Sequence, residues 1–221
     1  MTNDVSSRSA DSDRPLFLRE RPPRPIAPPR ARPAPEGHVP GETGLWVFIL
    51  GDMTLFGVFF CAFLVTGHQM PALFAQSRAA LDQTIGAVNT LVLITSSVFV
   101  AFAMSALRRD RRAQALRCVA VAIGMAIVFA ALKVVEYSGE AAAGHGPGEN
   151  LFFTYYFVLT GIHLLHLVIG ATLLTVLWRR IRAATVTRDR MLFAEGAAVY
   201  WHMVDLLWIV LFPLLYLVVL T

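Results

Sequence analysis

The chain has few charged residues and only two cysteines. Charged side chains make up 15% of its 221 residues, whereas hydrophobic ones make up 56%. A soluble domain usually carries about 25% charged residues, so this composition excludes a soluble globular protein. Cys61 and Cys118 fall roughly 20 Å apart in depth when a helical rise of about 1.5 Å per residue is counted, which excludes a disulfide between them.

Five apolar stretches are long enough to cross a hydrocarbon core, which takes about 20 residues for a helix. They lie near residues 45–66, 85–107, 117–137, 151–178 and 195–220. The sequence therefore predicts an all-α membrane protein, a bundle of five transmembrane helices. Residues 1–44 are rich in proline and arginine and are expected to form a disordered cytoplasmic tail, with residues 45–221 as the transmembrane domain.

The basic residues predict how the bundle lies in the membrane. All 19 are arginines except Lys133, and 17 of them fall in the tail, the second connection and the fourth connection. By the positive-inside rule, the N-terminus is cytoplasmic and the C-terminus lies outside, as a multi-pass protein of a bacterial plasma membrane. The arginines sort by membrane side and form no single patch with interleaved aromatics, so no nucleic-acid partner is expected.

Besides Lys133 and Glu136 of the third span, six ionisable residues of interest fall inside the predicted spans, where an unpaired charge costs several kcal/mol. They are Asp52, His163, His166, Glu195, His202 and Asp205. Helical rise places Asp52 and His202 near 10 Å from the cytoplasmic end, and Asp205 and His166 near 15–18 Å. We expect a buried, proton-related polar network in which Asp52 pairs with His202 and Asp205 pairs with His166.

Two other interpretations of these residues stay open. Histidines and carboxylates suit zinc, copper or iron, but neither an HExxH motif nor a Glu-x-x-His set occurs, and no metal is expected. The carboxylates could instead pass protons, as ionisable chains do in pumps. Lys133 and Glu136 lie three residues apart on one helix face, which favours a structural ion pair at the outer end of the third span.

Small and aromatic residues in the spans give further predictions about packing. We expect helices to approach each other closely at Gly124, Gly161 and Gly170. Tyr137, Tyr156 and Tyr216 are near span ends and are expected in an interfacial belt. Trp201 and Trp208 lie deeper and are expected to contact another subunit.

Five segments of the chain resemble, in order and spacing, subunit III of the haem–copper oxidases. They read WVFILGDMTLFGVFF, NTLVLITSS, KVVEY, FFTYYFVLTGIHLLHLVIG and EGAAVYWHMVDLLW. The resemblance covers about residues 44 to 221. It is strongest with the five-span branch associated with nitric oxide reductase gene clusters.

This resemblance implies a non-catalytic subunit of a respiratory, cytochrome c oxidase type complex in aerobic electron transport. The chain would pack beside catalytic subunit I and next to subunit II, with haem and copper in the partner and no redox centre of its own. Membrane phospholipid is an implied ligand, and proton uptake is implied at Asp52, where the family commonly has Glu. The alternatives are an accessory subunit of a nitric oxide reductase and, from another class, an independent transporter of protons or small ions.

Overall fold

Helices account for almost all of the residues that the structure, a computed structural model, describes: 43–183 and 188–218. The helices are α2 (Thr43–Gln69), α3 (Pro71–Ala80), α4 (Gln83–Arg108), α5 (Arg112–Ala142), α6 (Leu151–Ala183) and α7 (Arg188–Tyr216). All except α3 are long and apolar enough to cross a membrane, and no strand occurs in the described part of the chain. The predicted all-α fold with five spans is therefore confirmed.

The long helices differ from their predicted ranges mainly in length. The third and fourth spans extend past the predicted limits, to Arg112–Ala142 and Leu151–Ala183. Hydropathy marks only the apolar part of a helix, whereas the hydrogen-bonded backbone continues into the polar boundary of the membrane. All described helices belong to one unit, Val39–Thr221, and the predicted tail, residues 1–44, falls almost entirely outside the described residues.

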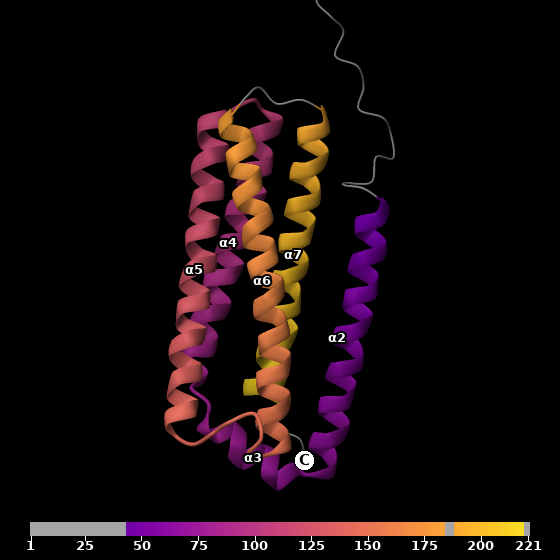
Figure 1. The fold of residues 1–221 in the computed structure, drawn as a ribbon, viewed down its shortest axis with the longest axis vertical. Helices are drawn as coiled ribbons and strands as arrows, with labels where there is room; N and C mark the ends of the chain where they lie inside the picture. Colours follow the sequence, from indigo (N-terminus) through magenta and orange to yellow (C-terminus); the bar gives the residue numbers. More distant parts are fainter. Residues whose placement is uncertain (1–42, 184–187, 219–221) are drawn as a thin grey trace, which may run out of the picture. The chain divides into compact units, whose positions relative to one another are not determined.

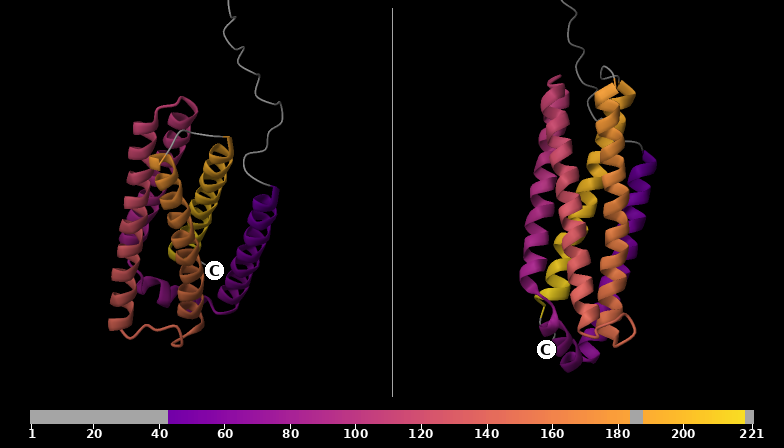
Figure 2. Two further views of the ribbon diagram at one scale, coloured as in Figure 1. Left: turned by 45° about the horizontal axis from the view of Figure 1, so that its top comes forward. Right: turned by 60° about the vertical axis from the view of Figure 1, so that its left-hand side comes forward.

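The five long helices run side by side and alternate in direction (Figure 1). The most extensive helix pair is α4 with α5, followed by α6 with α7, α4 with α7, and α5 with α6. Helix α2 lies at the edge of this group, against α7, α3 and α6 (Figure 2). We call one end of the bundle the α3 end; it contains the last turns of α2, α5 and α7. We call the opposite end the arginine end; it contains the last turns of α4 and α6.

The short helix α3 was not expected from the sequence. Pro71 occupies its first turn, where the missing N–H of proline costs no hydrogen bond. Its Phe74 is 2% exposed and packs against Phe63 and Phe152, with ring centroids 5.1 and 5.4 Å away. Ten residues are too few to show a convincing helical period, so this helix depends on that aromatic contact for its position.

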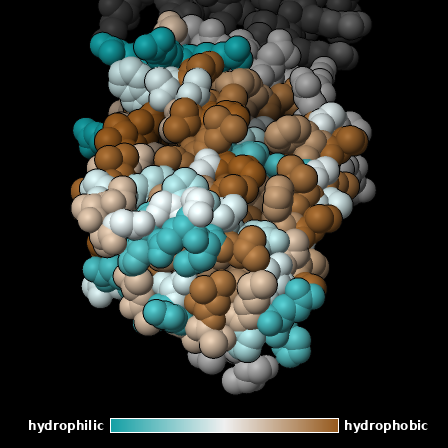
Figure 3. All heavy atoms as spheres, turned by 60° about the horizontal axis from the view of Figure 1, so that its bottom comes forward, coloured by the Kyte–Doolittle hydropathy of each residue, from teal (hydrophilic) through white to brown (hydrophobic). Residues whose placement is uncertain are grey.

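The turns at the helix ends follow ordinary capping chemistry. The Asp82 side chain accepts hydrogen bonds from the backbone N–H groups of Thr84 and Ile85, at 2.8 and 3.3 Å, and so begins α4. Helix α5 ends at Ala142, and Gly144, two residues later, has a left-handed φ of 87° that costs glycine little. A space-filling view toward the α3 end shows hydrophilic side chains gathered there and hydrophobic ones along the flank (Figure 3).

Two expectations about aromatic residues are wrong. Tyr156 and Tyr216 are fully buried and do not line a membrane interface. Trp201 and Trp208, at 1% and 0% exposure, also point into the bundle and leave no ring surface for another subunit. Position along a span gives the depth of a ring but not the helix face that carries it, and these rings lie on inward faces.

Of the three glycines predicted to lie at close helix contacts, only one does so. A Cβ atom at Gly170 would lie 2.9 Å from Trp201 Cε3, so α6 and α7 do meet closely there. Gly124 and Gly161, in contrast, have no neighbouring atom within 4 Å of such a Cβ. A second close approach lies at Gly86 of α4, where the Cβ would meet the Phe212 ring at 2.8 Å.

Candidate functional site

Helix α5 carries two buried charges of opposite sign near the α3 end. Lys133 Nζ lies 3.0 Å from Glu136 Oε2, and the two side chains are 1% and 2% exposed. Separation by three residues puts both on the face that α5 turns toward α6 and α7. A buried ion pair is stable only where further hydrogen bonds satisfy the remaining donors and lone pairs.

Two tyrosines supply those further bonds. The Tyr156 hydroxyl donates to Glu136 Oε1 at 2.7 Å, and the Tyr216 hydroxyl donates to the same oxygen. Lys133 Nζ in turn donates to both hydroxyl oxygens at 3.2 Å. Lys133, Glu136, Tyr156 and Tyr216, here called the lysine cluster, thus join α5, α6 and α7.

Aromatic faces complete the surroundings of the lysine. Its Nζ lies 5.0 Å from the ring centroid of Tyr156 and 5.2 Å from that of Trp208, within the range of cation–π attraction. Trp208 itself is fixed by its Nε1–H, which donates to Thr90 Oγ1 of α4 at 3.0 Å. The lysine cluster therefore contacts all four helices from α4 to α7, directly or through this tryptophan.

His163 lies next to this cluster without a hydrogen bond. It is fully buried, and neither ring nitrogen has a hydrogen-bond partner among the described residues. Its ring instead contacts Trp208 and Phe129, with centroids 5.1 and 5.7 Å away. His163 is therefore held by aromatic packing and is separate in role from His166, three residues further along α6.

His166 forms the second buried pair, with Asp52 of α2. His166 Nε2 lies 3.0 Å from Asp52 Oδ1, and both side chains are at most 10% exposed. The other nitrogen, Nδ1, lies 2.8 Å from the Ile162 carbonyl oxygen, which can only accept, so Nδ1 carries a proton. Asp52 Oδ2 has no partner within the described residues.

The pairs that the sequence predicted are not the ones that form. Asp52 meets His166 and not His202, and Asp205 does not meet His166. The depth estimate brought Asp52 within reach of either histidine, but depth does not say which helix face adjoins which. Asp52 faces α6, whereas His202 faces α4.

The remaining predicted residues lie between α4 and α7. Ser97 Oγ is 2.5 Å from His202 Nδ1, and the same serine interacts with the buried Asp205 carboxyl. Asp205 Oδ1 has no hydrogen-bond partner in the described part of the chain. Glu195 lies apart from this group, at the arginine end, with its Oε1 3.4 Å from Arg108 Nη2.

The arrangement suits hydrogen bonding and proton exchange better than metal binding. In residues 43–183 and 188–218, no three His, Cys, Asp or Glu side chains come close enough together to hold a metal ion. Cys61 and Cys118 are both free thiols. Tyr156 and Tyr216 were not predicted as members of this site. A buried lysine and glutamate require additional hydrogen-bonding groups, and that requirement was the available signal for tyrosines at the same depth.

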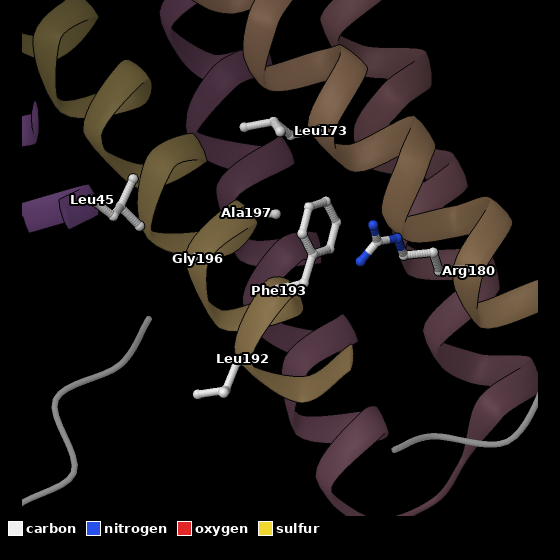
Figure 4. Close-up of a pocket in the computed structure, with 7 residues that line it drawn as sticks. All are labelled: Leu45, Leu173, Arg180, Leu192, Phe193, Gly196 and Ala197. Carbon is white, nitrogen blue, oxygen red and sulfur yellow. The ribbon is translucent and has the colours of Figure 1, made fainter. Parts of the chain in front are cut away.

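A largely apolar cavity of about 420 Å³ opens between α2, α6 and α7 at the arginine end. Leu45, Leu173 and Leu192 line it, and the Arg180 guanidinium lies 4.2 Å from the centroid of the Phe193 ring beside it (Figure 4). The cavity combines apolar walls with one cationic group at the membrane boundary.

Fold and site together define a multi-pass membrane protein with ion pairs and hydrogen bonds buried among its helices. The chain belongs to the cytochrome c oxidase subunit III family, which matches residues 41–219. The family membership predicted from the sequence is thus confirmed, whereas the nitric-oxide-reductase-associated branch stays a prediction.

Individual relatives agree with this family. The chain is 34% identical to cytochrome c oxidase subunit 3 of Synechocystis sp., over 79% of the chain and 74% of the relative. It is 32% identical to cytochrome c oxidase subunit 3 of Thermostichus vulcanus, over 78% and 85%. It is 29% identical to the heme-copper oxidase subunit I+III of Aeropyrum pernix, over 80% of the chain and 22% of that longer protein.

Proposed function

We propose that the chain is the non-catalytic subunit III of a respiratory haem–copper oxidase, packed beside catalytic subunit I, which holds the haem and copper. The family match over residues 41–219 carries this proposal. The Aeropyrum relative supports it, because its name joins subunits I and III in one chain. Subunit II is proposed as a further neighbour, and the bacterial plasma membrane as the location.

Purification in mild detergent tests the assembly. A haem-bearing larger subunit should co-purify with the tagged chain in constant ratio. Recovery of a stable, haem-free chain alone would count against the proposal. Proton or ion flux through proteoliposomes of the purified chain alone would instead support the transporter alternative.

Asp52 is proposed to support proton uptake by the complex. Its support is geometric: one carboxylate oxygen faces His166, and the other lies buried with no partner among the described residues. A carboxyl group that contacts an imidazole and keeps a second oxygen available has the geometry to exchange a proton with it.

Turnover of the whole oxidase complex tests this role. Asp52→Asn removes the titrating oxygen and should lower turnover several-fold or shorten the catalytic lifetime, whereas Asp52→Glu should keep both. Thr54→Val, on the exposed side of the same helix, is the matched control and should leave turnover unchanged. Equal turnover and lifetime in the Asn and Glu variants would make Asp52 a structural residue.

Phospholipid is proposed to occupy the cavity between α2, α6 and α7. Its walls suit an acyl chain, and Arg180 at the membrane boundary suits a phosphate group.

The positive-inside rule, applied to the arginine end, further supports a cytoplasmic N-terminus.

A further inference from the structure

One face of the bundle differs from the others because it exposes an imidazole in mid-membrane, whereas the exposed Thr54 and Thr172 hydroxyls elsewhere donate to their own helix backbone. His202 of α7 is exposed and lies about 16 Å from Met191 and about 21 Å from Tyr216, the two limits of its span. The other exposed titratable side chains of the described spans lie within about two turns of a helix end. His202 is thus the exception, and an imidazole facing acyl chains is unfavourable.

The neighbours of His202 satisfy only part of its hydrogen-bonding capacity. Ser97 of α4 bonds to Nδ1, and no other hydrogen bond of this side chain exists within the described residues. Nε2 is therefore available for a group outside the chain. One turn away, Asp205 Oδ1 is also without a partner in the described part of the chain.

The surface around His202 is shaped to receive a helix. A groove of about 490 Å³ runs from His202 toward the arginine end, between α4 and α7. Its lining includes three small side chains, Ala101, Ser105 and Ala198, which let a membrane helix approach closely. The flank formed by α5 and α6 has a groove of similar size, but it contains no imidazole, and its Thr172 and Thr175 hydroxyls donate to carbonyl oxygens of their own helix.

We propose that this α4/α7 face, centred on Ser97 and His202, is the surface that receives a transmembrane helix of the catalytic subunit. That helix supplies a hydrogen-bonding side chain to His202 Nε2. The proposal rests on the proposed function and adds the face, and the contact residue, through which the two subunits meet.

The charges favour this occupant over lipid and over a second copy. Acyl chains have no group that can hydrogen-bond an imidazole in mid-membrane. Two copies related by a two-fold axis would bring Arg108 and Arg109, at the mouth of the groove, toward their own equivalents. A helix of a different subunit meets neither difficulty, because it can carry both an acceptor for His202 and a carboxylate near the arginines.

Photo-crosslinking in the intact complex tests the face directly. A benzophenone amino acid replaces Ile94 or Leu206 on the α4/α7 face, at 40% and 48% exposure, and Val128 of α5 or Val168 of α6, at 48% and 54%, as matched controls. We expect adducts with the haem-bearing subunit from positions 94 and 206 and none from 128 and 168.

Any other crosslinking pattern would contradict either the α4/α7 face or the proposed function. Adducts with the haem-bearing subunit from 128 or 168 alone would overturn the α4/α7 face while leaving the proposed function intact. Adducts from 94 and 206 with a second copy, or with lipid only, would also overturn it. A chain that neither co-purifies nor crosslinks with any haem-bearing subunit would instead remove the proposed function itself.

Substitution of His202 supplies an independent readout. His202→Leu should raise the fraction of subunit III lost from the complex at a given detergent concentration several-fold, whereas His202→Gln keeps a hydrogen-bonding group and should lose less. Equal retention in the wild type and both variants, with the chain folded, would contradict the contact at His202.

Discussion

Lys133 shows how many contacts a buried charge requires. Its partner on the same helix, Glu136, is only one of the groups it needs. Two tyrosine hydroxyls and the Trp208 face surround the same Nζ atom. The i, i+3 spacing predicts the first contact, but the others come from helices far away in the sequence.

Removal of Glu136 should therefore be costly. Glu136→Ala leaves the Lys133 ammonium buried without its counter-charge and should destabilise the fold by about 3–5 kcal/mol. The double variant Lys133→Met/Glu136→Leu should recover part of that loss, because no unpaired charge remains. Heating followed by size-exclusion chromatography of the purified protein measures the change.

The ion pair at the arginine end, whose Glu195 side chain is 11% exposed but whose arginine lies at the surface, provides the comparison. The Arg108 side chain is 62% exposed, so Arg108→Ala should change stability by about 0–1 kcal/mol. A Glu136→Ala variant as stable as this one would show that the buried pair contributes nothing net. A double variant no better than Glu136→Ala would assign the loss to packing alone.

The two histidines of the HLLH segment show a limit of spacing at the residue scale. His163 and His166 look alike in the sequence, three residues apart on one helix. In the structure, His163 packs between aromatic rings and His166 pairs with Asp52. A rotation of 300° separates them on the helix, nearly one turn, and the small remaining angle directs them to different neighbours.

At the scale of helices, two of the glycines in the described residues lie where a neighbouring helix leaves no room for a Cβ atom. Gly170 brings α6 against the Trp201 ring of α7, and Gly86 brings α4 against Phe212. Gly161, also on α6, meets open space. The same residue type thus fixes a helix contact at one position and contributes nothing to packing at another.

A matched pair of substitutions on α6 tests this difference. Gly170→Ala forces its Cβ into Trp201 and should destabilise the fold by about 1–3 kcal/mol. Gly161→Ala adds helix propensity in open space and should be neutral or stabilising by up to about 1 kcal/mol. Thermal stability of the two variants in the same detergent gives the comparison; equal losses would contradict the assignment of the α6–α7 contact to Gly170.

At the scale of the whole molecule, the arginines are the only guide to direction across the membrane. Gly146, in the connection before α6, belongs to the α3 end, and Arg109, after α4, belongs to the arginine end. The positive-inside rule predicts that the α3 end faces out.

Thiol labelling in intact cells tests this direction. On a background of Cys61→Ser and Cys118→Ser, a membrane-impermeant thiol reagent should label the Gly146→Cys variant and leave the Arg109→Cys variant unlabelled. The latter should react only after permeabilisation. The reverse pattern would place the N-terminus outside.

The sequence by itself determined that the protein lies in a lipid bilayer, how many helices cross it and which family the chain belongs to. These follow from composition, from the length of each apolar run and from the order of five segments, all of which are local or linear properties of the chain. It also predicts which ionisable side chains lie at membrane depth, because depth is proportional to residue number along a helix.

Only the tertiary structure decided which of those side chains meet. Asp52 pairs with His166, two tyrosines complete the lysine cluster, and His202 is left on an open face. Each outcome depends on the rotation of a helix about its axis and on its choice of neighbours. Both are set by packing between residues that are distant in the sequence, so no count along the chain contains them.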